Sequence, residues 1–155
     1  MVDIRKPIVD RLVSEVPLTK QSCNGFDTFV YTNIPNILSE LHPILCEHET
    51  RALRIAFLKP TIKAPCTVEK NGDSRPIYPS ECRLRGLTYG APLYVDLRLT
   101  RTHMGKDDES ILKDVYLGRV PIMVFSDLCY LRDPATRVER GECTMDPGGY
   151  FIING

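Results

Sequence analysis

The segment LYVDLRLT, residues 93–100, alternates apolar and polar side chains without interruption. Successive side chains of a β-strand point to opposite faces of a sheet, so this pattern gives one apolar and one polar face. The apolar side chains are Leu93, Val95, Leu97 and Leu99. One packed face and one solvated face are typical of an antiparallel sheet, and the segment therefore predicts such a sheet.

The residues after this strand predict the rest of a mostly antiparallel sheet. The polar segment Met104–Ser110 is typical of a hairpin loop, with a return strand over residues 111–116 or beyond. The apolar segment Val120–Phe125 predicts a further strand. A short helix is expected near Asp133–Val138, where Pro134 suits the first turn.

The residues before the strand predict one more strand and an irregular segment. From residue 51 onward, Leu53, Ile55 and Phe57 lie at alternate positions, which favours a strand. Residues 59–80 contain four prolines and a turn sequence, so we expect an extended, looping segment with short strands at most.

Helices are predicted at about residues 24–45, after an N-terminal arm at 1–22. Asn24 has the side chain of a helix cap, and the apolar residues that follow it recur at helical spacing. Pro35 interrupts the pattern, so we expect two helices that divide at Asn33-Ile34-Pro35.

The last residues combine a turn, a strand and a second turn. Asp146-Pro147-Gly148-Gly149 has the chemistry of a β-turn, and Tyr150–Ile153 is typical of a strand. Asn154-Gly155 is the pair favoured in two-residue hairpins. The pattern favours a truncated chain or one that completes its sheet with other material, although a frayed terminus would look the same.

The composition restricts the class of protein. Lys+Arg and Asp+Glu both number 20, and a free-standing nucleic-acid binder usually has a marked basic excess. A subunit with one local basic patch remains compatible with this balance. No apolar run approaches the ~20 residues of a transmembrane helix, and the start lacks the apolar core of a signal peptide, so an intracellular protein is expected.

The six cysteines are scattered without a C-x-x-C pair and are expected to be free thiols. His42, Cys46 and His48 could bind zinc, but a fourth ligand at a usual spacing is missing, so a metal site is disfavoured. Asp107-Asp108-Glu109 favours a solvated loop over a metal site. Gly148-Gly149 favours a plain turn over a phosphate loop. We find no catalytic constellation in the sequence.

Three segments carry a resemblance to a known family. They are residues 79–96 (PSECRLRGLTYGAPLYVD), 117–124 (LGRVPIMV) and 141–155 (GECTMDPGGYFIING). Together they resemble the second-largest subunit of multisubunit DNA-directed RNA polymerases of the eukaryotic, archaeal and large-DNA-virus type. The helical stretch Phe26–Leu41 resembles the family more weakly.

The resemblance implies an α+β fold, with N-terminal helices followed by a mostly antiparallel sheet. Residues 23–155 would form an incomplete protrusion domain, with strands over about 51–155, and the chain would be a fragment or part of a split subunit. It would form a wall of the DNA cleft and support transcription, while the nucleotidyl transfer takes place elsewhere in the complex. The acidic loop after residue 104 and Val124-Phe125-Ser126-Asp127 depart from the usual pattern, which leaves the polymerase class open.

The resemblance also implies partners and cofactors. The partners would be the largest subunit, other polymerase subunits, the template DNA duplex and initiation factors, with no membrane. No cofactor is expected in this segment, whereas Mg and Zn are expected elsewhere in the full polymerase. The location would be the nucleus, or the cytoplasm or virion for an archaeal or viral protein. The alternative is a self-contained polymerase-derived module that binds or regulates a polymerase without catalysis.

Basic residues are the candidates for contact with DNA. Arg98, Arg101 and Lys106 are predicted to bind the DNA backbone. Arginine can bind phosphate oxygens in bidentate fashion, and contacts to phosphate hold DNA without reading its sequence. Arg83 and Arg85 would share a face if Cys82–Leu87 were extended. For these two, ion pairs with nearby carboxylates or with neighbouring subunits are favoured over DNA contacts.

Overall fold

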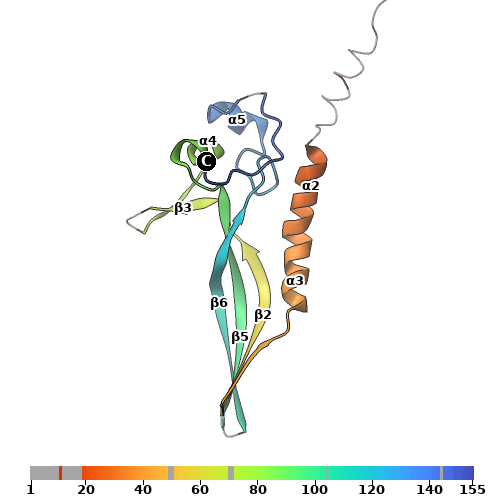
Figure 1. Cartoon of the computed structure of the whole chain (residues 1–155), viewed down its shortest axis with the longest axis vertical. Coiled ribbons are helices and arrows are strands. Elements are labelled where there is room, and N and C mark those ends of the chain that lie inside the picture. Colours follow the sequence, from red (N-terminus) through yellow and green to blue (C-terminus); the bar gives the residue numbers. More distant parts are fainter. Residues whose placement is uncertain (1–10, 12–18, 49–50, 70–71, 104, 144) are drawn as a thin grey trace, which may run out of the picture. The chain divides into compact units, whose positions relative to one another are not determined.

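The structure is a computed structural model that describes residues 11, 19–48, 51–69, 72–103, 105–143 and 145–155. The described residues fall into two compact units. The sheet unit contains Thr28–Pro76 and Gly90–Val120, and the loop unit contains the residues up to Asp27, Ile77–Tyr89 and Pro121–Gly155. Figure 1 gives the order of the elements along the chain.

The sheet unit is built on an antiparallel sheet of four strands in the order β1-β2-β5-β6. The strands are β1 (Ile44–His48), β2 (Arg51–Ile62), β5 (Gly90–His103) and β6 (Lys106–Pro121). Strand β5 contains the alternating segment 93–100 and pairs with β2. The predicted α+β fold with helices before an antiparallel sheet is confirmed.

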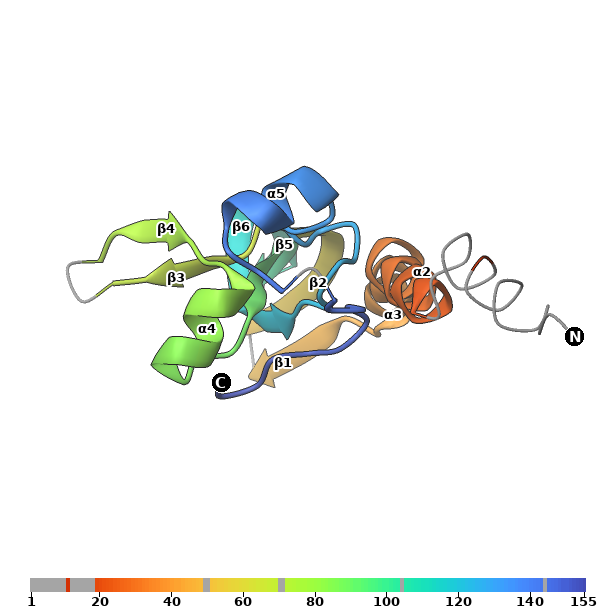
Figure 2. The same ribbon diagram turned by 90° about the horizontal axis from the view of Figure 1, so that it is seen from above.

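The core of the sheet unit lies between the helix α3 (Ile34–Glu40) and one face of this sheet. Ile34 and Leu38 pack against Val95, which is 1% exposed. Phe57, Ile62, Leu93 and Leu97 surround them. Figure 2 shows α3 beside β2, viewed from above. The apolar face predicted for β5 is therefore the face that α3 covers.

A π-helical turn, η1 (Phe29–Asn33), stands between α2 (Lys20–Thr28) and α3. The N–H of Ile34 donates to the carbonyl of Phe29, five residues back. Pro35 cannot donate a backbone hydrogen bond and would crowd the carbonyl four residues before it, so a widened turn here has a local cause. Instead of the predicted division at 33–35, helical backbone continues from Lys20 to Glu40, and the widened turn ends just before Pro35; the helical region also begins at Lys20 instead of Asn24.

The helical region ends at Glu40, and Ile44–His48 forms the strand β1, although helix was expected to about residue 45. Pro43 disfavours helical backbone at the preceding residue. Beyond it, β1 pairs with β2, with Ile44 opposite Ile55 and His48 opposite Arg51. The strand conformation of this segment therefore depends on its pairing with β2, which follows it in the sequence.

The hairpin between β5 and β6 is tighter than predicted. Strand β6 begins at Lys106, so the acidic run Asp107-Asp108-Glu109 lies in a strand and not in a loop. Gly105 has φ +76°, which a tight turn requires and which glycine adopts at little cost. The hydroxyl of Thr102 donates to Oδ1 of Asp107 at 2.6 Å, across the hairpin.

Residues 59–80 are more regular than expected. Strand β2 runs through Pro60 to Ile62, and its register with β5 shifts between Phe57 and Pro60, where proline cannot donate to the ladder. A small second sheet follows, formed by β3 (Cys66–Val68) and β4 (Ser74–Pro76).

Two short helices belong to the loop unit. The helix α5 (Pro134–Glu139) confirms the predicted helix, and the Asp133 side chain caps it by accepting from the N–H of Ala135 at 3.1 Å. The helix α4 (Pro79–Arg85) shows that the extended conformation considered for Cys82–Leu87 was wrong. Gly86 ends α4 with φ +63°. None of the helices in the described ranges is long and apolar enough to span a bilayer.

Val120–Phe125 and Tyr150–Ile153 were both predicted as strands, but of these residues only Val120 and Pro121 lie in one. Strand β6 ends at Pro121, and Phe125 turns the chain with φ +70°. Single hydrogen bonds replace the ladder: the N–H of Val124 donates to the carbonyl of Tyr150, and that of Tyr89 donates to the carbonyl of Ile152. Asn154 and Gly155 have φ +56° and +98°, the sign that the predicted two-residue turn requires.

Candidate functional site

Basic side chains gather at the end of the sheet where β1 meets β2. Strand pairing places His48 opposite Arg51, and Arg51 opposite His103. Two residues further along, Arg101 lies opposite Leu53, which in turn lies opposite Cys46. Residues that pair directly or lie two apart on a strand share one face, so these side chains belong to the same side of the sheet.

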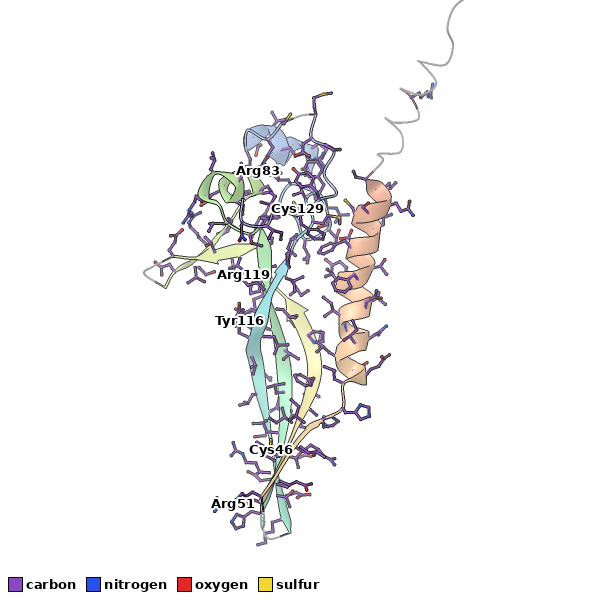
Figure 3. The ribbon with its side chains drawn as sticks, in the orientation of Figure 1. Cys46, Arg51, Arg83, Tyr116, Arg119 and Cys129 are labelled. Atoms are coloured by element: carbon purple, nitrogen blue, oxygen red, sulfur yellow. The ribbon has the colours of Figure 1, made fainter. Side chains whose placement is uncertain are left out.

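These side chains line a pocket of about 380 Å³. The pocket is lined by Cys46, His48, Arg51, Ala52, Leu53, Arg101, Thr102 and His103. Of these described lining residues, none carries a carboxylate. Figure 3 shows Cys46 and Arg51 at the end of the sheet that lies beyond the last turn of α3. We call this feature the tip pocket.

The structure separates the three residues predicted to bind the DNA backbone. Arg101 lines the tip pocket. Arg98 pairs with Ala56 and lies an odd number of residues from Arg101, so it belongs to the opposite face of the sheet. Lys106 begins β6 and does not line the pocket.

Arg51 and His103 were not predicted as site residues from the sequence, and His48 was considered only for zinc. Each lies near a strand end, where alternation alone does not show which residues become neighbours. A pairing of the segment at 51–57 with the segment at 97–103 would have brought them together with Arg101. The missing information was the register between strands about 50 residues apart.

Cys46 and His48, two of the three residues considered for zinc, both line the tip pocket, whereas His42 does not. His42 lies between α3 and β1, outside both elements. Within the described ranges, no group of three or more His, Cys, Asp or Glu side chains is arranged to hold a metal ion. All six cysteines are free thiols, as predicted.

Arg83 joins α4 to the C-terminal part of the loop unit. Its Nη1 lies 2.8 Å from Oε2 of Glu142, and its Nη2 donates to the Tyr150 hydroxyl at 2.7 Å. The same Nη2 lies 3.5 Å from Oδ2 of Asp146. The other Glu142 oxygen accepts from the backbone N–H of Ser80 at 2.9 Å. Arg83 therefore forms the ion pairs that the sequence analysis favoured.

Arg85 also pairs with a carboxylate, but within its own helix: its Nη1 lies 2.5 Å from Oε1 of Glu81. Their spacing is i,i+4, which places both on one side of α4. Neither arginine of this motif lies in the tip pocket.

Burial and hydrogen bonds shift the pKa of Arg83, Tyr89 and Tyr150 in the loop unit. Desolvation acts to lower the pKa of Arg83, but its bonds to Glu142 and Tyr150 outweigh this and raise it. Burial, together with the carboxylate of Asp146, raises the pKa of Tyr150. Burial raises the pKa of Tyr89 well above its usual range, with a further contribution from Cys129. The shifts of Arg83 and Tyr150 come from the contacts that join α4 to residues 142–150.

The three sequence segments that resemble the polymerase family meet through the backbone of Tyr89. Its carbonyl accepts from the N–H of Ile122 at 2.9 Å, and its N–H donates to the carbonyl of Ile152 at 3.0 Å. Tyr89, Ile122 and Ile152 come from the first, second and third segment respectively. Figure 3 labels Arg83 and Cys129 in this unit.

Comparison with known proteins identifies the family. A sequence model of the family described as RNA polymerase beta subunit matches residues 17–155. Subunit RPB2 of DNA-directed RNA polymerase II from Meyerozyma guilliermondii is 35% identical over 96% of this chain. Subunit Rpo2N of the DNA-directed RNA polymerase of Methanothermobacter thermautotrophicus (strain Delta H) is 34% identical over 96% of it.

A third relative, subunit RPC2 of DNA-directed RNA polymerase III from Saccharomyces cerevisiae, is 36% identical over 89% of this chain. The chain spans 14%, 28% and 12% of the lengths of these three relatives. The family match includes all three segments that meet at Tyr89 and the strands that form the tip pocket. The chain therefore belongs to the RNA polymerase beta subunit family.

Proposed function

We propose that this chain is part of the second-largest subunit of a DNA-directed RNA polymerase, where it forms a wall of the DNA cleft. The observation that carries the proposal is the family match over residues 17–155. It is supported by the way the three family-like segments converge on one compact unit through Tyr89 and Arg83. These contacts join residues that are far apart in the sequence.

In this proposal, nucleotidyl transfer takes place elsewhere in the complex. Metal-assisted transfer needs carboxylates that converge on the same ions. The acidic run Asp107-Asp108-Glu109 lies in β6, and strand alternation places Asp107 and Glu109 on one face and Asp108 on the other. The three carboxylates therefore do not share one face. The Mg and Zn of the polymerase would be held by other parts of it.

The proposed partners are the largest subunit, the other polymerase subunits, the template duplex and initiation factors. Large apolar side chains that are exposed support docking on other proteins. In the loop unit, Leu84 and Met145 are 88% and 85% exposed, and in the sheet unit Ile111 and Tyr116 are both 55% exposed. The site of action would be the nucleus in a eukaryote, the cytoplasm in an archaeon, or the virion for a virus.

The test is to purify the protein from its native source through an affinity tag on this chain. We expect a stoichiometric complex that contains the largest polymerase subunit and synthesises RNA on a DNA template. The subunit composition is measured by mass spectrometry and the activity by incorporation of labelled nucleotide. Recovery of the chain without any polymerase subunit would exclude the proposal.

The alternative, a module that regulates a polymerase, predicts a different result of this purification. Such a module would be present in only a fraction of the polymerase molecules, beside a complete second-largest subunit from another gene. Removal of the chain would then leave active polymerase. In the proposal, removal of the chain abolishes templated synthesis.

A further inference from the structure

The tip pocket brings four basic side chains to one face of the sheet, from three different strands. His48 comes from β1, Arg51 from β2, and Arg101 and His103 from β5. Directly paired residues have Cβ atoms about 4.5–5.5 Å apart, and diagonal neighbours about 7–8 Å. Arg51 and Arg101 are diagonal neighbours, since Arg51 pairs with His103. Two guanidinium groups can therefore reach the same bound group.

Of the acidic residues in the described strands near this end of the sheet, Glu47 and Asp107 lie on the opposite face. Glu47 pairs with Ala52, and Asp107 accepts from Thr102, which places both carboxylates on the face away from Arg51, although Ala52 and Thr102 also line the pocket. Alternation places Asp108 on the same side as Arg101, but it does not line the pocket. Like charges that face each other across strands repel, and a bound anion would relieve that repulsion.

The chemistry of the lining fits phosphate groups. Arginine presents a planar fork of N–H donors that binds phosphate oxygens in bidentate fashion. A neutral imidazole still donates one N–H, so His48 and His103 add donors in either protonation state. The pocket volume of about 380 Å³ leaves room for more than one phosphate group.

An acidic protein segment fits the pocket less well. Peptide recognition relies on buried anchors, usually large side chains that fill a desolvated hole. The apolar lining here consists of Cys46, Ala52 and Leu53, with Cys46 exposed. Phosphate contacts need no such hole, because they are made at the surface and depend on charge and donor geometry.

We propose that the tip pocket binds the phosphate backbone of nucleic acid through Arg51 and Arg101, assisted by His48 and His103. The inference rests on the proposed function, which brings nucleic acid to this subunit, and it selects one face of the sheet. Of the residues predicted from sequence, Arg101 belongs to this site, whereas Arg98 lies on the other face.

The test uses the purified complex that contains the chain, with wild-type sequence or with Arg51→Gln and Arg101→Gln together. Binding of a fluorescently labelled duplex without promoter sequence is measured by anisotropy at increasing KCl concentration. Each phosphate contact contributes about 0.9 to the slope of log K against log salt, so loss of two contacts should reduce the slope by about 1.8. An unchanged slope would overturn the inference.

The matched control is Arg54→Gln with Lys113→Gln. These residues lie in β2 and β6, carry the same charge, are exposed and do not line the pocket, and Arg54 pairs with Thr100 and faces away from it. We expect the control to keep the wild-type slope. An equal reduction in both double variants would show a general charge effect and would overturn the site.

Two further measurements distinguish a failure of the pocket proposal from a failure of the proposed function. Subunit composition is measured on the same samples: loss of a protein partner with an unchanged DNA slope would assign the pocket to an acidic protein and overturn the inference. Templated RNA synthesis is measured in parallel. If the wild-type complex synthesises RNA but the pocket variants keep the wild-type salt slope, the phosphate-binding role of the pocket is refuted and the proposed function stands. If the purified wild-type material has no polymerase activity, the proposed function is refuted.

Discussion

Arg83 Nη1 lies 2.8 Å from Oε2 of Glu142, a carboxylate whose side chain is only 3% exposed. The pair joins residues 59 positions apart in the sequence, and Glu142 also accepts from the backbone N–H of Ser80. A buried carboxylate without its cation is costly, which makes this pair a determinant of the stability of the loop unit.

Arg83→Leu is expected to destabilise the loop unit because it leaves Glu142 buried without its cation. Breaking a fully buried pair costs about 3–5 kcal/mol, and since Arg83 is 36% exposed we expect about 2 kcal/mol. The control Arg85→Leu, in the same helix, removes an i,i+4 pair with Glu81 and should cost less than about 0.5 kcal/mol. Hydrogen exchange of the α4 amides measures the loss of stability in both variants. Equal protection in the two variants would contradict the stabilising role of the Arg83–Glu142 pair.

Gly148→Ala is expected to destabilise the turn before Tyr150. A Cβ on Gly148 would lie 2.1 Å from Cδ2 of Phe125, and the residue has φ +67°. The left-handed backbone costs about 1–2 kcal/mol for alanine, and the overlap with Phe125 adds about 1–3 kcal/mol.

Gly141→Ala is the matched control for this overlap. Gly141 has φ +69°, but no atom lies within 4 Å of the position of its Cβ. It should therefore cost only the backbone penalty of about 1–2 kcal/mol. The difference is measured by hydrogen exchange at the amides of Val124 and Gly149, and similar losses for the two alanines would argue against the packing of Gly148 on Phe125.

Val95→Ala is expected to weaken the sheet unit, because Val95 is 1% exposed and packs on Ile34 and Leu38. Removing buried methyl groups costs the lost transfer energy and the cavity left behind, about 2 kcal/mol here. Val68→Ala in β3 makes the same chemical change at a residue that is 62% exposed and should cost less than about 0.5 kcal/mol. Hydrogen exchange of the β2 and β5 amides measures the difference: it should become faster in Val95→Ala and stay near the wild-type rate in Val68→Ala.

The stability of the loop unit is expected to fall as the pH rises above about 10, the usual pKa of tyrosine. Burial raises the pKa of Tyr89 and, together with Asp146, that of Tyr150, so the folded chain keeps these protons while the unfolded chain loses them. The stabilisation is fully present below the unfolded pKa and is lost as the pH rises toward the folded one. The free energy of unfolding, measured at increasing pH from pH 8 upward, tests this expected loss of stability.

Tyr150→Phe provides the comparison, since phenylalanine has no proton to lose. The variant should lose stability less steeply with pH than the wild-type chain. Phenolate absorbance gives an independent readout: of the seven tyrosines, those at 89 and 150 should ionise late in the folded chain and normally in denaturant. A folded chain whose tyrosines all ionise together would contradict the prediction.

Local patterns predicted the features that depend on a few neighbouring residues. The alternation at 93–100 predicted β5 and its apolar face, and Pro134 predicted the start of α5. Asp146 forms the turn expected of it by accepting from the N–H of Gly148 at 2.9 Å. Each of these depends on side-chain period, on the fixed φ of proline or on a hydrogen bond between near neighbours.

Segments whose conformation depends on a distant partner were predicted less well. Ile44–His48 becomes a strand because β2 pairs with it, and the acidic run at 107–109 becomes part of β6 because the hairpin closes tightly at Gly105. Tyr150–Ile153 has strand-like residues, but in the described part of the chain its backbone accepts single hydrogen bonds from Val124 and Tyr89 and does not pair in a ladder. Strand propensity forms a ladder only where a second strand supplies one in register.

The sequence alone determined the family, through three segments between residues 79 and 155, and the class of fold, through the period of its apolar side chains. The tertiary structure decided which basic residues act together. Arg98 and Arg101 are close in sequence but lie on opposite faces, whereas Arg51 and Arg101 are 50 residues apart and line one pocket. The physical reason is that alternation assigns a face, and only the register between strands assigns the neighbours on it.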